Sequence, residues 1–234
     1  MKIIKGSISF EATDGGEWYG YWPSVQADSW EPHTYRIFAR FLDKEHSYVD
    51  IGAWIGPTVL YGCQLAKHCY AVEPDPVALK MLHKHVQING FENVTVFEGA
   101  IGDKNGEIQL GCYAPGQRFQ LGESMTSMLF GTDTFVTNAF TIEQLFAHYK
   151  IADCNFIKMD IEGGELRVLP QAVTYLEKLG VPLYLSVHFQ FLSPPQLGIV
   201  ADVLQKYRME FEDGKAVSAD DIRAGRVGEI LVFF

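Results

Sequence analysis

Two carboxylates and an imidazole stand at positions where acid–base chemistry can be done. Asp160 and Glu162 follow the apolar run 154–159, and His188 follows the apolar run 183–187. A side chain that accepts the proton of a hydroxyl nucleophile speeds its reaction by roughly 10²–10⁴-fold. We therefore predict that Asp160, Glu162 and His188 are catalytic, with Asp160 or His188 as the base.

The same three side chains allow other interpretations. Two carboxylates and an imidazole could bind a metal ion, but acids closely spaced after a strand also serve as ligand contacts or as charges at a helix N-terminus. We therefore predict no metal site. For His188 alone, a buried structural histidine is an equally good interpretation.

A second group of residues is arranged to hold an adenosine ligand. Gly52 lets the backbone turn and approach a ligand, and Gly56 permits close packing of the following helix. Glu73 comes about 20 residues after Gly52, which is the spacing at which a carboxylate reaches the two hydroxyls of a ribose. The segment Asp50-Ile-Gly-Ala-Trp-Ile-Gly56 lacks the central glycine of the dinucleotide fingerprint. A pyrophosphate cofactor is therefore disfavoured.

Strands that alternate with helices must position both groups. Short apolar runs predict strands at 48–52, 69–73, 94–97, 154–159, 183–187 and 227–234. Capping residues and apolar spacing predict helices at 57–67, 76–90, 165–179 and 195–207. This alternation predicts a mostly parallel sheet with helices on both faces, whose ligands bind beyond the carboxyl ends of the strands. The carboxylates, the glycines and His188 all fall at such ends.

Composition narrows the class of protein. The 234 residues, 47% of them hydrophobic, suit one domain, 1–234. The formal net charge of -10 argues against nucleic acid as a partner. Neither a secretory signal nor an apolar segment long enough to cross a membrane is recognisable, so we expect a cytoplasmic protein without a membrane partner. The oligomeric state is left open, and a homodimer is compatible with the sequence.

Two segments fall outside the alternation of strands and helices. Residues 1–34 form an N-terminal extension rich in aromatic residues, and residues 101–145 form an insertion in which Gly, Thr and Ser interrupt short β-like runs. We expect both segments to recognise the substrate that accepts the transferred group, or to form an interface with another chain. The aromatic residues of the extension, Trp18, Tyr19, Tyr21, Trp22 and Trp30, are expected to serve more as packing than as a stacking platform.

Three segments together resemble the FkbM family of class I S-adenosylmethionine-dependent methyltransferases. Tyr48-Val-Asp-Ile-Gly-Ala-Trp-Ile-Gly56 resembles the family's first loop, and Ala71-Val-Glu-Pro-Asp-Pro76 resembles its second acidic element. Phe156-Ile-Lys-Met-Asp-Ile-Glu-Gly-Gly-Glu165 resembles its hallmark and is the most specific of the three. Trp54 and the tripeptide Ser186-Val-His188 depart from the family pattern.

The resemblance implies a fold, a cofactor and roles for residues. The fold is α/β, a Rossmann-like, doubly wound, mostly parallel seven-stranded sheet of the class I methyltransferase type with an antiparallel C-terminal strand. The cofactor is S-adenosyl-L-methionine, with Asp160 near the methyl group. Its implied contacts are Asp50, Gly52, Ala53 and Gly56 around the methionine part, Glu73 with Pro74 at the ribose, and Glu98 with Ala100 at the adenine.

By analogy with the family, the expected reaction is O-methylation of a hydroxyl on a small molecule or sugar. N- or C-methylation with the same cofactor site is one alternative. A nicotinamide-dependent oxidoreductase and a non-catalytic module that binds an adenosine ligand are the others.

Overall fold

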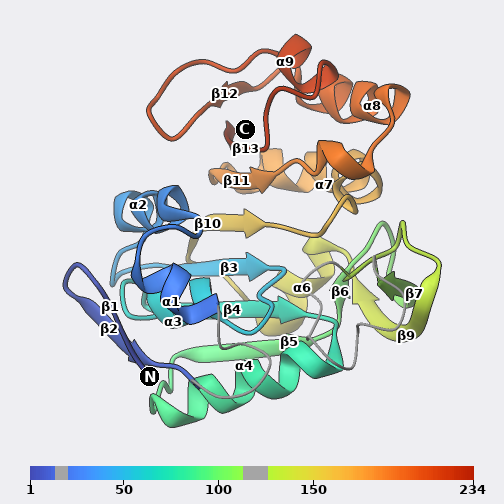
Figure 1. Ribbon diagram of the computed structural model, residues 1–234. Helices are drawn as coiled ribbons and strands as arrows, with labels where there is room; N and C mark the ends of the chain where they lie inside the picture. Colours follow the sequence, from blue (N-terminus) through green and yellow to red (C-terminus); the bar gives the residue numbers. More distant parts are fainter. Residues whose placement is uncertain (14–20, 113–125) are drawn as a thin grey trace.

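A central sheet organises the computed structural model, which describes residues 1–13, 21–112 and 126–234. Its seven strands lie in the order β12-β13-β11-β10-β3-β4-β5 (Figure 1). The five parallel strands are β3 (Ser47–Ile51), β4 (His68–Glu73), β5 (Val94–Glu98), β10 (Cys154–Met159) and β11 (Leu183–Ser186). β13 (Glu229–Phe233) runs antiparallel between β11 and β12 (Arg208–Glu210). The predicted doubly wound, mostly parallel sheet with an antiparallel C-terminal strand is confirmed.

Each face of the sheet carries its own hydrophobic core, because successive side chains of a strand point to opposite faces. Val49 and Ile51 belong to one core, whereas Tyr48 belongs to the other. The first core is closed by α6 (Ile142–Tyr149), α7 (Glu165–Leu179), α8 (Pro194–Leu204) and α9 (Ala219–Arg223). The second is closed by α2 (Pro32–Phe41), α3 (Pro57–Gly62) and α4 (Pro76–Ile88).

Local sequence signals account for most helix boundaries. Asp75 caps α4, because its side chain accepts hydrogen bonds from the backbone N–H groups of Val77 and Ala78. The helix predicted over 57–67 is shorter than expected: α3 ends at Gly62. The chain then continues in tighter turns, such as the bond from Leu65 N–H to Gly62 O, which bring it round to β4.

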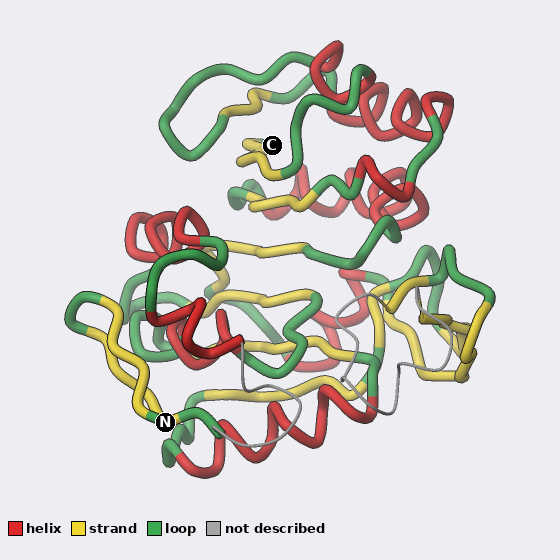
Figure 2. The backbone as a smooth tube through the Cα atoms, in the orientation of Figure 1, coloured by secondary structure: helices red, strands yellow, loops and turns green. Residues whose placement is uncertain are grey.

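The described residues of the predicted insertion form most of a second, smaller sheet. Its strands are β6 (Ala100–Ile101), β7 (Gly106–Cys112), β8 (Thr126–Ser127) and β9 (Thr132–Phe140), in the order β6-β9-β7-β8. Figure 2 shows these strands beyond the carboxyl ends of the central strands, at the right of the view. The predicted insertion therefore lies at the edge of the sheet where ligands are expected.

The N-terminal segment forms a hairpin and a short helix. β1 (Lys2–Lys5) pairs antiparallel with β2 (Ile8–Glu11), and α1 (Tyr21–Gln26) follows. Trp22 is fully buried against Phe10 and His85, which agrees with a packing role. Tyr21 and Trp30 line the cavity described below, and Trp18 and Tyr19 lie outside the described residues.

Candidate functional site

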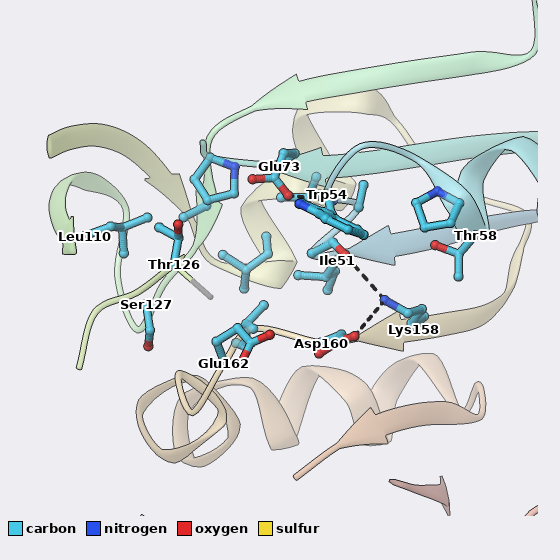
Figure 3. A pocket seen from close by; sticks show the side chains of 18 of the residues that line it. Ile51, Trp54, Thr58, Glu73, Leu110, Thr126, Ser127, Lys158, Asp160 and Glu162 are labelled. Carbon is cyan, nitrogen blue, oxygen red and sulfur yellow. Dashed lines mark hydrogen bonds and ion pairs between the residues drawn. The ribbon is translucent and has the colours of Figure 1, made fainter. Parts of the chain in front are cut away.

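A cavity of about 320 Å³ opens at the carboxyl ends of β3, β4 and β10 (Figure 3). Seven of the residues predicted for the site line it: Gly52, Ala53, Glu73, Pro74, Ala100, Asp160 and Glu162. Parts of the two segments outside the alternation complete the wall, namely Tyr21, Trp30 and Glu31 on one side and Leu110, Thr126, Ser127 and Met128 on the other. The cavity thus joins the predicted cofactor residues to the predicted acceptor segments.

Gly52 is required by a close approach between two strand ends. Its φ is +81°, and a Cβ there would lie 1.7 Å from the backbone oxygen of Asp160. The backbone N–H of Asp160 in turn donates to Ile51 O at 2.9 Å. Glycine is therefore needed to pack the loop after β3 against the chain leaving β10, a reason that sequence reasoning, which invoked a ligand, did not find.

Three N–H groups of the loop after β3 have backbone acceptors within the protein. Those of Gly52 and Ala53 both donate to Val72 O at 3.0 Å, and that of Gly56 donates to Ala53 O at 2.9 Å. These three N–H groups are therefore already bonded within the protein. Gly56, at φ +98°, lies against α4: a Cβ would meet Leu82 Cδ1 at 2.7 Å, in agreement with its predicted packing role.

Glu73 ends β4 with a buried carboxylate at the cavity. One oxygen accepts the backbone N–H of Trp54 at 2.7 Å, and the other accepts that of Asp75 at 2.8 Å. Burial raises the pKa of Glu73 to about 8, although both hydrogen bonds act in the opposite direction. The carboxylate therefore orders the loop after β3 while it faces the space where a ligand would bind.

A buried lysine, which sequence reasoning missed, stands at the centre of the site. Lys158 Nζ lies 3.4 Å from Asp50 Oδ1, from Asp160 Oδ2 and from the backbone oxygen of Gly52. Burial lowers the pKa of Lys158, but Asp50 and Asp160 outweigh it and keep the ammonium charged. The sequence feature that could have identified Lys158 is its position inside the otherwise mostly apolar run 154–159.

Asp50 lies behind the cavity wall rather than in it. Its side chain is fully buried, and in the register of the sheet it stands directly across from Lys158. It contacts the site through this lysine, and its place around the ligand's methionine part stays a prediction.

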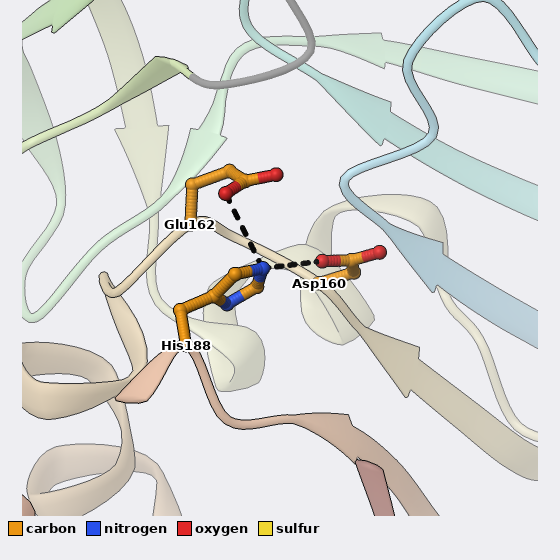
Figure 4. A group of neighbouring side chains, drawn as sticks. All are labelled: Asp160, Glu162 and His188. Atoms are coloured by element: carbon orange, nitrogen blue, oxygen red, sulfur yellow. Dashed lines mark ion pairs between the residues drawn. The ribbon is translucent and has the colours of Figure 1, made fainter. Parts of the chain in front are cut away.

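Asp160, Glu162 and His188 come together (Figure 4). His188 Nε2 lies 3.2 Å from Asp160 Oδ1 and 3.3 Å from Glu162 Oε2. His188 Nδ1 lies 2.8 Å from Oε1 of Glu165, whose side chain is fully buried. The two carboxylates line the cavity, and the imidazole stands behind them.

The charges of this cluster shift one another's pKa values. Burial lowers the pKa of His188, but hydrogen bonds to Asp160 and Glu165 outweigh it and raise the pKa to about 11. Burial raises the pKa of Asp160, yet Lys158 and His188 together bring it well below its usual range. For Glu162 burial prevails and raises the pKa to about 8. The acid–base groups of the site are thus strongly coupled.

Glu31 is a further acid that sequence reasoning did not select. It precedes α2 with a left-handed backbone, φ 39°, and lines the cavity. Burial and the nearby Asp160 raise its pKa to about 7. Because it belongs to the N-terminal segment, no strand–helix alternation pointed to it.

Glu98 lies away from the cavity. Its exposed carboxylate is 2.9 Å from His83 Nε2, and it is absent from the cavity wall among the described residues. Glu98 ends β5 with its side chain toward solvent, whereas Ala100, two residues later, reaches the wall. Of the two residues predicted at the adenine, Ala100 therefore lines the cavity and Glu98 does not.

Fold and site define a doubly wound α/β protein with a ligand cavity at the strand ends, rich in acids. The model of the methyltransferase FkbM domain matches residues 50–209, and the chain belongs to this family. The resemblance found in the sequence is confirmed.

Among solved structures, the chain is similar to the methyltransferase FkbM from Methylobacillus flagellatus KT, with 19% identity and a TM-score of 0.49. The alignment covers 90% of this chain and 53% of that one. A precorrin-6y C5,15-methyltransferase from Geobacter metallireducens GS-15 has 13% identity and a TM-score of 0.48, covering 96% of this chain and 95% of that one.

A curated relative, an uncharacterized protein of Methanocaldococcus jannaschii, is 30% identical over 60 residues, or 26% of this chain and 23% of that protein. The chain therefore spans well under two thirds of the relatives named first in each comparison. Within the described residues, no helix has the length and apolar character needed to cross a membrane.

Proposed function

We propose that the protein is an S-adenosylmethionine-dependent methyltransferase and that this cofactor binds in the cavity of Figure 3. The observation that carries the proposal is the Glu73 carboxylate, held at the cavity by two backbone N–H groups in a chain of the methyltransferase FkbM family. A buried acid in this position suits a ribose, because each oxygen keeps a lone pair for a hydroxyl.

Other residues of the wall suit the remaining parts of the cofactor. Ala100, Ile101 and Leu110 offer an apolar surface for the adenine. Asp160 offers negative charge to the ammonium and sulfonium groups, and Lys158 keeps that carboxylate ionised. When bound, S-adenosylmethionine supplies a methyl group activated by the sulfonium. The protein's task is then to orient the acceptor and to keep the site dry.

We propose a hydroxyl on a small molecule or sugar as the acceptor. An aliphatic hydroxyl is a poor nucleophile until its proton is removed, and Asp160 and Glu162 bring proton acceptors to the cavity wall. The acid-rich wall, which also includes Glu31, favours a neutral or cationic acceptor over a phosphorylated one. The net charge of -10 argues in the same way against nucleic acid.

Calorimetric titration tests the cofactor. We expect S-adenosylmethionine to bind saturably to the wild type and Glu73→Gln to weaken it at least tenfold, because the amide offers one acceptor oxygen where the carboxylate offers two. Glu107→Gln, at an exposed position of β7, is the matched control and should bind like the wild type. Tighter binding of a nicotinamide dinucleotide than of S-adenosylmethionine would favour the oxidoreductase alternative.

A panel of sugars and hydroxylated small molecules tests the reaction. Mass spectrometry should detect the gain of one methyl group, and fragmentation should locate it on oxygen. Methylation at nitrogen or carbon would overturn the choice of acceptor atom and leave the cofactor site standing. Cofactor binding without transfer to any acceptor would support the non-catalytic module.

A further inference from the structure

Three potential ligand atoms from Asp160, Glu162 and His188 converge on one point (Figure 4). They lie within 4.8 Å of one another, and His188 Nε2 is 3.2 Å and 3.3 Å from the two carboxylates. Ligand atoms bound to one ion at about 2.1 Å lie roughly 3.0–3.4 Å apart in octahedral or tetrahedral arrangements. The two distances from His188 Nε2 are therefore those of adjacent ligands around a single ion.

The imidazole is supported in the way that metal-binding histidines are. Its Nδ1 lies 2.8 Å from the buried Glu165 carboxylate, and the ring of Phe191 stacks on it with an interplanar angle of 13°. A histidine that ligates a metal usually donates its other N–H to a carboxylate or carbonyl, which fixes the tautomer. Here that contact turns Nε2 toward Asp160 and Glu162.

The backbone is bent to bring Glu162 into this position. Glu162 has a left-handed φ of 53°, and Gly163 follows at φ 90°, where a Cβ would meet Leu129 Cδ1 at 2.6 Å. A left-handed conformation at a non-glycine residue costs about 1–3 kcal/mol and persists where the surroundings impose it. The bend thus holds a second carboxylate against the imidazole, although one would suffice to orient it.

Three carboxylates, those of Asp160, Glu162 and Glu165, contact the one imidazole ring. Lys158 contacts the other oxygen of Asp160 at 3.4 Å and is itself shared with Asp50. A divalent cation at the point of convergence would replace the Nε2 proton of His188 and contact the two carboxylates that line the cavity.

We propose that Asp160, Glu162 and His188 bind one divalent transition-metal ion of the series from Mn²⁺ to Zn²⁺. A donor set of one imidazole and two carboxylates suits these ions better than Mg²⁺ or Ca²⁺, which prefer oxygen ligands alone. Asp160 and Glu162 line the cavity, so open positions of the ion face it. The site would hold the acceptor hydroxyl, a role that rests on the proposed function. The sequence alone favoured no metal, because acids closely spaced after a strand also serve as ligand contacts or as charges at a helix N-terminus.

Binding of Mn²⁺ to chelator-treated full-length protein tests the site without any turnover. Electron paramagnetic resonance should detect about one tightly bound ion per chain, with a nitrogen coupling from the imidazole. We expect Asp160→Asn, Glu162→Gln and His188→Gln each to weaken binding at least tenfold, and His188→Gln to remove the nitrogen coupling. Glu165→Gln should weaken binding about tenfold and keep the coupling, as expected of a residue that positions the ligand.

His33→Gln is the matched control. His33 also pairs with a carboxylate, that of Glu229, but outside the cavity, so Mn²⁺ affinity should not change. Circular dichroism of each variant checks that it is folded. The proposal is overturned if the wild type binds neither Mn²⁺ nor Zn²⁺ saturably below about 1 mM, or if His188→Gln and Glu162→Gln bind like the wild type.

Titration with S-adenosylmethionine on the same samples separates this inference from the proposed function. Metal binding without cofactor binding would remove the proposed function and leave the metal site. Cofactor binding without metal binding would remove the metal site and leave the proposed function. A chelator that abolishes methyl transfer while cofactor affinity is kept would support both.

Discussion

The two sides of the cavity are built by different means. On the side of β3 and β4, hydrogen bonds of the backbone and one carboxylate, Glu73, define the wall. On the side of β10 and β11, charged side chains define it, as Asp160, Glu162 and His188 converge with Lys158 beside them. Each side is built from two consecutive strands, but the second also needs Asp50, far earlier in the chain, to pair with Lys158.

The contrast indicates how the two sides can change. A wall made from backbone tolerates little variation, because the N–H groups of Gly52, Ala53 and Trp54 in the loop after β3 have fixed partners on β4. A wall made from side chains can change its chemistry by substitution, but each change in a charged residue must be matched by a change in the charged residues that it contacts. We therefore expect the β3–β4 side to set the cofactor and the opposite side to set the acceptor and the chemistry.

Gly52→Ala should break both sides at once and give the largest effect. A Cβ would lie 1.7 Å from Asp160 O, at a φ of +81° that alanine avoids. We expect a loss of about 3 kcal/mol or more in the free energy of unfolding, measured in urea. Gly90→Ala has a φ of +64° but open space around it, so it should lose only about 1 kcal/mol. Equal losses for the two variants would contradict the close approach.

Asp160→Asn should separate the two sides. We expect methyl transfer to fall by roughly 10²–10⁴-fold and the affinity for S-adenosylmethionine to fall by much less, since the charge offered to its ammonium and sulfonium groups is lost but the β3–β4 side is intact. Turnover and calorimetry measure the two quantities. Asp153→Asn, at the opposite end of β10, where the carboxylate pairs with Lys67, serves as the control for a lost acid. Wild-type turnover in both Asp160→Asn and His188→Ala would exclude a catalytic role.

Glu73 should make stability depend on pH. Its pKa is about 8 in the folded protein against 4.5 when unperturbed, so the folded state holds this proton more tightly. Its contribution to stability is complete below pH 4.5 and is lost as the pH rises to about 8. Relative to Glu73→Gln, the free energy of unfolding of the wild type should fall by at most about 1.4 kcal/mol per pH unit in this window. Parallel pH profiles would show that the carboxylate is not perturbed.

Glu98→Gln should have the smallest effect. It tests whether the cofactor site on the β3–β4 side extends as far as Glu98. Its carboxylate is exposed beside His83, away from the cavity wall. We expect less than a twofold change in the affinity for S-adenosylmethionine, measured by calorimetry. A tenfold loss would restore the sequence-based expectation that Glu98 contacts the adenine.

The difference between the two sides of the cavity also determined which site residues could be predicted from the sequence. The loop at Gly52 and the acid at Glu73 were found because a strand, a turn and a helix are encoded within a few residues. Lys158 was missed because a lysine in an apolar run has no meaning until Asp50 is placed across the sheet from it. Glu31 was missed for a similar reason, since a distant segment brings it to the cavity.

Short elements were also beyond sequence reasoning. β12 has three residues and α9 has five, too few for any periodicity to be recognised. The approximate positions of the predicted longer strands could be read, because each is an apolar run bounded by turn residues. The hydrogen bonds inside the loop after β3 could not be anticipated, since their acceptor, Val72 O, belongs to the neighbouring strand.

The place of β13 bears on how the chain is made. Residues 229–233 lie between β11 and β12 in the sheet, although both of those strands precede them in the chain. During synthesis, β11 therefore has an open edge, and β12 lacks its partner, until this segment has emerged. An unpaired strand edge invites pairing with other chains. A nascent chain halted just before residue 229 should thus be especially dependent on chaperones.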